Sequence, residues 1–130
     1  MMKPISVWKQ ELSGGAHAAR LAALYCCAPE QTPAQAARYE AVLDGLEATF
    51  GPHAEAGLYS APGRTEIGGN HTDHQHGRVL AGSVNIDMIA AAGPNTLGQL
   101  RVQSEGYDLC VIDLNDLAAR KEEENTSAAI

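Results

Sequence analysis

The residues with the most potential for chemistry lie between Gly63 and Gly77, in a segment that is rich in glycine and nearly free of apolar side chains. Ionised carboxylates accept hydrogen bonds, arginine donates them, and asparagine and histidine do either. Glycines let the backbone approach a ligand closely. Such a segment suits a ligand with many hydroxyl groups, such as a sugar, and a polar surface turn is the competing interpretation. Its functional side chains are Arg64, Glu66, Asn70, His71, Asp73, His74 and His76.

The histidines of this segment are also residues that bind metals. In an extended conformation His74 and His76 would share one face, and His71 and Asp73 the other. This spacing does not match a zinc pattern such as His-Glu-x-x-His. We therefore predict no metal site, and a divalent-metal protein stays as a third interpretation of the chain.

Two glycines of the segment, Gly63 and Gly68, have the spacing of a phosphate-binding P-loop. Gly69 and Asn70 then stand where that motif needs lysine followed by serine or threonine. No Gly-x-Ser-x-Gly nucleophile motif is present either. We therefore predict no cofactor-binding residue in this chain.

Composition restricts the class of protein. The chain has 130 residues, is 45 % hydrophobic and carries a net charge of −7, which suits one folded domain over residues 1–130 and excludes a disordered chain. So acidic a chain lacks the basic surface that binds nucleic acid or anionic membranes. It has no apolar run of the ~18 residues that a membrane helix needs and no signal peptide, so we expect a cytoplasmic protein.

The elements that position the segment are helices before it and strands around it. Helical periodicity runs over residues 8–27 with a break at Gly14 and Gly15. A second helix over residues 32–50 starts with Thr32, Pro33 and a capping-box Gln35. Strands are predicted at 57–61, 79–80 and 84–92, with a loop at 63–77 and a hairpin at 100–114.

The predicted fold class is α/β (α+β), with helices packed on a mixed sheet of about four or five strands. A final helix is expected from Asp116, capped by Asn115 or Asp116. That helix ends at Ile130 without a C-cap residue, so we expect a chain truncated inside an element. A sheet face left uncovered by the truncation would allow self-association.

Residues 61–80 resemble the N-terminal signature of galactokinases, which are members of the GHMP small-molecule kinase family. That signature reads Ala-Pro-Gly-Arg-Val-Asn-Leu-Ile-Gly-Glu-His-Thr-Asp-Tyr, then a short turn and Gly-x-Val-Leu. The order of helices and strands also fits the N-terminal domain of the family. The matching residues are Ala61, Pro62, Gly63, Arg64, Gly69, His71, Thr72, Asp73, Gly77, Val79 and Leu80.

The resemblance implies roles for individual residues. It places Arg64, Asn70, His71 and Asp73 in the sugar pocket, where Asp73 holds ring hydroxyls. Arg64 would lie near the anomeric hydroxyl and have the orienting, catalytic role.

The chain departs from the signature at several positions, of which the most important are Glu66, Gly68, Asn70 and His74, in place of Asn, Ile, an acidic residue and Tyr. The carboxylate of Glu66 could compensate for the one that is missing at Asn70, so Glu66 joins the substrate-binding candidates. The expected ligand is galactose or a related hexose.

The complete enzyme implied by the resemblance phosphorylates galactose at its anomeric hydroxyl with ATP and Mg²⁺. Nothing from Leu80 to Ile130 resembles the family's later phosphate loop or its catalytic aspartate. We therefore expect this chain alone to bind sugar weakly and to be inactive. A stand-alone, non-catalytic sugar-binding or regulatory module is the alternative.

Overall fold

The computed structural model describes residues 1–69, 76–118 and 121. The chain divides into two compact units, Met1–Gly93 and Pro94–Ile130. Helices and antiparallel strands make up the described residues, which confirms the α+β fold class. The described strands form two antiparallel sheets, whereas the sequence suggested a single mixed sheet.

The first unit begins with two short helices, α1 (Ile5–Ser13) and α2 (Ala18–Tyr25). The predicted break at Gly14 and Gly15 is confirmed, and Gly15 has a positive φ of +74°, a conformation that favours glycine. Cys26 ends α2 in the left-handed region, with φ of +47°.

The longest helix, α3 (Thr32–Phe50), begins and ends where the sequence predicted, with Pro33 in its first turn and Gly51 after its last. The predicted capping box is wrong. A 3₁₀ turn, η1 (Pro29–Gln31), runs directly into α3, so Thr32 is already helical. Its hydroxyl therefore donates to the carbonyl of Pro29 instead of accepting a hydrogen bond from the backbone.

The sheet of this unit has the order β1-β2-β3, in which β1 (Lys3–Pro4) and β3 (Leu80–Ala92) flank β2 (Glu55–Gly68). The predicted loop over 63–77 is therefore wrong for residues 63–68, which continue β2. The sequence suggested a strand end at Pro62 because proline has no N–H to donate. In the structure Pro62 directly precedes a register shift, where a strand accommodates proline.

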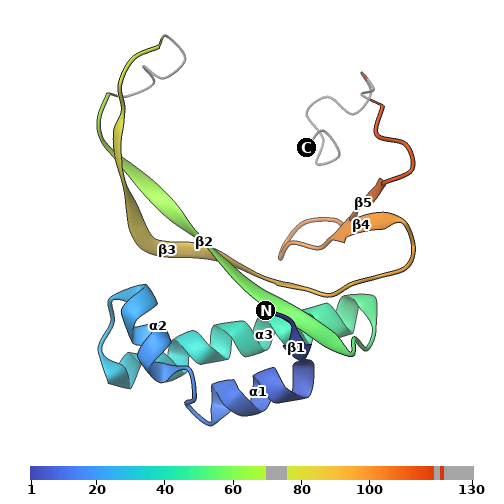
Figure 1. The fold of residues 1–130 in the computed structure, drawn as a ribbon, viewed down its shortest axis with the longest axis horizontal. Coiled ribbons are helices and arrows are strands. Elements are labelled where there is room, and N and C mark those ends of the chain that lie inside the picture. Colours follow the sequence, from blue (N-terminus) through green and yellow to red (C-terminus); the bar gives the residue numbers. More distant parts are fainter. Residues whose placement is uncertain (70–75, 119–120, 122–130) are drawn as a thin grey trace. The chain divides into compact units, whose positions relative to one another are not determined.

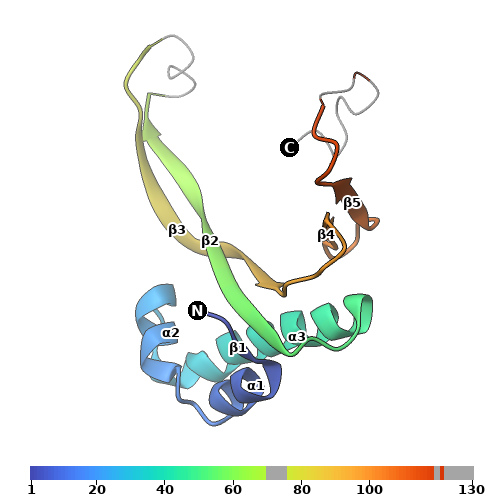
Figure 2. The same cartoon turned by 45° about the vertical axis from the view of Figure 1, so that its right-hand side comes forward.

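The three helices cover one face of the half of the sheet that is near β1, and the strands continue away from them toward Gly68 and Leu80 (Figure 1). Figure 2 shows the same arrangement from a second direction. The indole N–H of Trp8 donates to the carbonyl of Ala56 at 2.8 Å and so ties α1 to β2. The buried core residues are Ile5, Leu12, Leu21, Tyr25, Ala36, Tyr39, Leu43, Leu46 and Ala56.

The opposite face of β2 and β3 carries exposed apolar side chains. Ile86 and Met88 are 76 % and 78 % exposed, and Tyr59 is exposed beside them on β2. The apolar sheet face that the sequence led us to expect is thus present, and self-association through it stays a prediction.

The second unit contains a hairpin of β4 (Gln99–Val102) and β5 (Cys110–Asp113), as predicted for residues 100–114. The final helix that was predicted from Asp116 lies mostly outside the described residues. The described residues 116–118 are not helical, and the backbone N–H of Ala118 donates to the carboxylate of Asp116.

Candidate functional site

Two of the predicted sugar-binding residues lie on β2. Arg64 pairs with Ser83 and Glu66 with Ala81 on β3. Because they are two residues apart on a strand, Arg64 and Glu66 point to the same face, and Arg64 Nη2 lies 3.9 Å from Glu66 Oε1. The Arg64 side chain is 74 % exposed and that of Glu66 26 % exposed. At 3.9 Å and with so exposed an arginine, this ion pair contributes little to stability.

The backbones of Gly69 and Arg78 approach each other closely beyond the last strand pair, and we call this point the neck of the hairpin. Gly69 has a φ of +86°, and a Cβ added to it would lie 2.2 Å from the carbonyl oxygen of Arg78. Only glycine fits so close to another backbone. Arg64 and Glu66 therefore lie on the strand that leads directly into this neck.

The other three predicted site residues, Asn70, His71 and Asp73, lie outside the described residues, as does His74. The structure thus brings Arg64 and Glu66 together and does not test the rest of the predicted pocket. His76 is described and has a positive φ of +59°.

Residues 46–94 match the family described as the galactokinase galactose-binding signature. This chain carries a galactokinase galactose-binding signature. The match confirms the resemblance that residues 61–80 indicated, and it gives the chain a galactokinase-like sugar-binding region. It extends from the last turns of α3 through β2 and β3, which is less than half of the chain. No curated protein and no solved structure matches the chain significantly.

Within the galactose-binding signature, β3 carries a buried carboxylate that the sequence analysis did not place in a site. The Asp87 side chain is 3 % exposed. Its Oδ2 accepts hydrogen bonds from Tyr25 at 2.5 Å and from Ser60 at 2.6 Å, and its Oδ1 accepts one from Arg38 Nη2 at 2.7 Å. Tyr25 gives its only proton to Asp87, so Tyr39, 2.7 Å away, must donate to Tyr25. A lone acidic residue within the apolar run 84–92 was the available signal.

These contacts shift the titration of the network. Burial alone would raise the pKa of Asp87, but the hydrogen bonds from Ser60, Tyr25 and Arg38 outweigh it and hold that pKa below its ordinary value. The hydrogen bond to Asp87 raises the pKa of Arg38. Burial, together with the hydrogen bond to Asp87, raises the pKa of Tyr25. Asp87 and Arg38 therefore form a charged pair at neutral pH.

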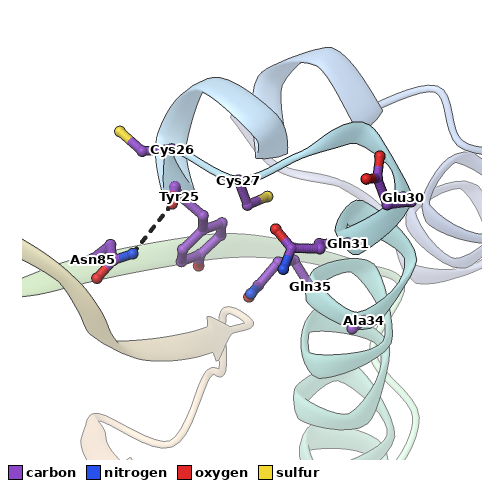
Figure 3. Close-up of a pocket in the computed structure, with 8 residues that line it drawn as sticks. All are labelled: Tyr25, Cys26, Cys27, Glu30, Gln31, Ala34, Gln35 and Asn85. Atoms are coloured by element: carbon purple, nitrogen blue, oxygen red, sulfur yellow. Dashed lines mark hydrogen bonds between the residues drawn. The ribbon is translucent and has the colours of Figure 1, made fainter.

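A pocket of about 520 Å³ borders this network where α2, η1 and α3 meet β3 (Figure 3). The side-chain amide of Asn85 donates to the backbone carbonyl of Tyr25 at its edge, at 3.4 Å. The pocket contains none of the predicted sugar-binding residues. Its lining residues are Tyr25, Cys26, Cys27, Glu30, Gln31, Ala34, Gln35 and Asn85.

Over residues 1–69, 76–118 and 121, no group of three or more metal-ligating side chains could hold an ion. Three of the four residues considered for a metal site, His71, Asp73 and His74, lie outside this range. Within the same range, no helix is both long and apolar enough to cross a bilayer. The cytoplasmic location stays a prediction.

Proposed function

We propose that residues 63–77 bind galactose or a related hexose. We further propose that the chain is the N-terminal sugar-binding part of a galactokinase-like enzyme, which phosphorylates the anomeric hydroxyl with ATP. The observation that carries this proposal is the galactose-binding signature over residues 46–94. The shared face of Arg64 and Glu66 at the neck of the hairpin supports it.

The proposed roles follow from hydrogen-bonding chemistry. The carboxylates of Glu66 and Asp73 accept hydrogen bonds from sugar hydroxyls, while Asn70 and His71 donate or accept. Arg64 offers a planar set of donors that offsets charge developing on the anomeric oxygen. A buried Asp73 would discriminate among sugars, because a sugar that lacks its hydroxyl partner leaves the carboxylate unpaired at a cost of about 1–3 kcal/mol.

Phosphoryl transfer needs ATP and Mg²⁺. Residues 80–130 contain no glycine- and serine-rich phosphate loop, of the kind that binds phosphate through helix N-terminal amides. The residues present therefore do not fit the nucleotide. We propose that the 130-residue chain alone does not transfer phosphate.

The alternative function is a stand-alone sugar-binding or regulatory module without catalysis. Both functions require the same sugar site. They differ in turnover, which ADP release with galactose and Mg-ATP measures. Robust ADP release by this chain would contradict its proposed inactivity.

Sugar binding is tested by titrating the full 130-residue chain with galactose and following its backbone amide NMR signals. We expect saturable shifts that start in residues 63–69 and 76–80, and weaker shifts with glucose, which differs at a single hydroxyl. Asp73→Asn should abolish the galactose response. The matched control is Asp108→Asn, which removes an exposed carboxylate outside the signature. Saturable shifts that Asp73→Asn leaves unchanged would place the sugar elsewhere.

A further inference from the structure

We propose that Asp87 is a positioning residue that sets the direction of the distal arm, defined as residues 63–68 of β2 and 80–83 of β3. The arm carries Arg64 and Glu66 and leads into the remaining sugar-binding candidates. The inference therefore deepens the proposed function and rests on it. It requires that Asp87 lie where the arm begins and that the arm have no other anchor to the helices.

The arm begins at a break in the strand pairing. Pro62 pairs with Asp87, but the next pair is Arg64 with Ser83. The single residue Gly63 is thus opposite the three residues 84–86, an irregularity that bends a hairpin. A Cβ on Gly63 would lie 3.1 Å from the carbonyl oxygen of Ile86, so the two backbones pass closely at this point. Asp87 is at the level of the bend.

The hydrophobic core does not hold the arm. Leu58, Ile89 and Ala91 pack against the core, and all three lie on the helix side of the bend. No core residue and no partly buried residue packed against the core belongs to the arm. In both views the arm continues away from the helices beyond this level (Figure 1, Figure 2). The polar contacts at the bend therefore determine its direction. They are the three hydrogen bonds to Asp87 and the longer one, at 3.4 Å, from Asn85 to the Tyr25 carbonyl.

The Asp87 contacts can do so because they join β3 to three other elements. The carboxylate on β3 binds Ser60 on β2, Tyr25 on α2 and Arg38 on α3. Arg38 is held in turn by Gln35, whose Oε1 accepts from Nη1 at 2.7 Å. Three donors from different directions leave the carboxylate a single orientation, because hydrogen bonds require specific distances and angles.

The energetics of such a group also favour a positioning role. The Asp87 side chain is buried and that of Arg38 is 40 % exposed. Burying the carboxylate offsets part of the Coulombic gain of the pair through desolvation. The distinctive property of the Asp87 network is its geometry. A sugar site needs its binding groups in fixed positions, because small displacements of these groups weaken binding strongly.

The arm's direction is measured directly by residual dipolar couplings of backbone amides in the arm and in α3. In the wild-type chain we expect one alignment tensor to fit both sets. In Asp87→Asn, which keeps the side-chain shape but removes the charge, we expect the arm to need a separate tensor with reduced amplitude. Arg38→Met is the second variant in case Asp87→Asn does not fold.

Galactose affinity is the functional readout. We expect Asp87→Asn to raise the Kd for galactose by about tenfold. Leu12→Val serves as the control, because Leu12 is a buried core residue of α1. It should lower the urea midpoint while leaving both the single tensor and the Kd unchanged. A single tensor together with an unchanged Kd in Asp87→Asn or Arg38→Met would overturn the inference.

The two proposals fail in different ways. A wild-type chain that does not bind galactose contradicts the proposed function, while the couplings of Asp87→Asn still decide whether Asp87 orients the arm. A wild-type chain that binds galactose, with variants that lose only stability, contradicts the positioning role alone.

Discussion

The hydroxyl of Tyr25, at the end of α2, donates a 2.5 Å hydrogen bond to the buried carboxylate of Asp87 on β3, 62 residues later in the chain. This contact connects the helical layer to the strand that continues into the signature's distal arm. It also makes Tyr25 the acceptor for Tyr39. The stability of the first unit should therefore depend on single hydroxyl groups in this network.

Tyr25→Phe tests that dependence. The substitution keeps the ring in the core but leaves Asp87 with two donors and Tyr39 without its acceptor. We expect the free energy of unfolding to fall by about 1–3 kcal/mol, measured by urea denaturation. Tyr59→Phe is the matched control, because Tyr59 is exposed, and it should change stability little. Equal effects of the two substitutions would contradict the importance of the network.

Stability should depend on pH through Asp87. Its pKa is lower in the folded chain than in the unfolded chain, so its ionised form stabilises the fold. That contribution is complete above the unfolded pKa of about 3.9 and is lost as the pH falls through the lower folded value. The difference in unfolding free energy between wild type and Asp87→Asn should therefore stay constant above about pH 5 and shrink as the pH falls from about 5 to about 2. A difference that stays constant in urea denaturation over this range would argue against the lowered pKa.

Because of the close approach at the neck, we expect alanine substitution to destabilise the chain at Gly69 but not at the adjacent Gly68. Gly69→Ala forces a residue with a side chain into a positive φ and places its Cβ against the Arg78 carbonyl. We expect a loss of about 1–3 kcal/mol and weaker galactose binding. Gly68→Ala is the control, because a Cβ there meets no atom within 4 Å. Thermal unfolding and galactose titration of both variants measure the contrast, and equal behaviour would contradict the tight neck.

Arg64→Lys should weaken galactose binding without loss of stability. Lysine keeps the charge but not the planar donor geometry of the guanidinium, and the Arg64 side chain is too exposed to support the core. Arg20→Lys makes the same change at an exposed position outside the signature and should leave binding unchanged. Calorimetric or NMR titration with galactose measures both. Unaltered binding by Arg64→Lys would remove Arg64 from the proposed sugar site.

Local sequence was sufficient for the helices before residue 51, the second hairpin and the galactose-binding signature. Gly14 and Gly15, Pro33 and Gly51 act on the backbone within a few residues, so the break between α1 and α2 and the limits of α3 could be predicted. The start of α1 at Ile5 and the end of α2 at Tyr25 differ from the predicted 8 and 27. The signature could be recognised because its glycine and polar residues are contiguous. The prediction that Thr32 caps the helix was wrong, because capping depends on the conformation of the preceding residues, and these form a 3₁₀ turn.

Tertiary structure alone decided where β2 ends and which groups Asp87 contacts. Residues 63–68 have a polar, glycine-rich composition, and they are a strand only because residues 80–83 pair with them. From the sequence, Asp87 was only an acidic residue inside an apolar strand. The structure shows that Tyr25, Arg38 and Ser60 donate hydrogen bonds to it. Partners so distant in the chain leave no local pattern, because hydrogen bonds across a fold depend on how whole elements pack.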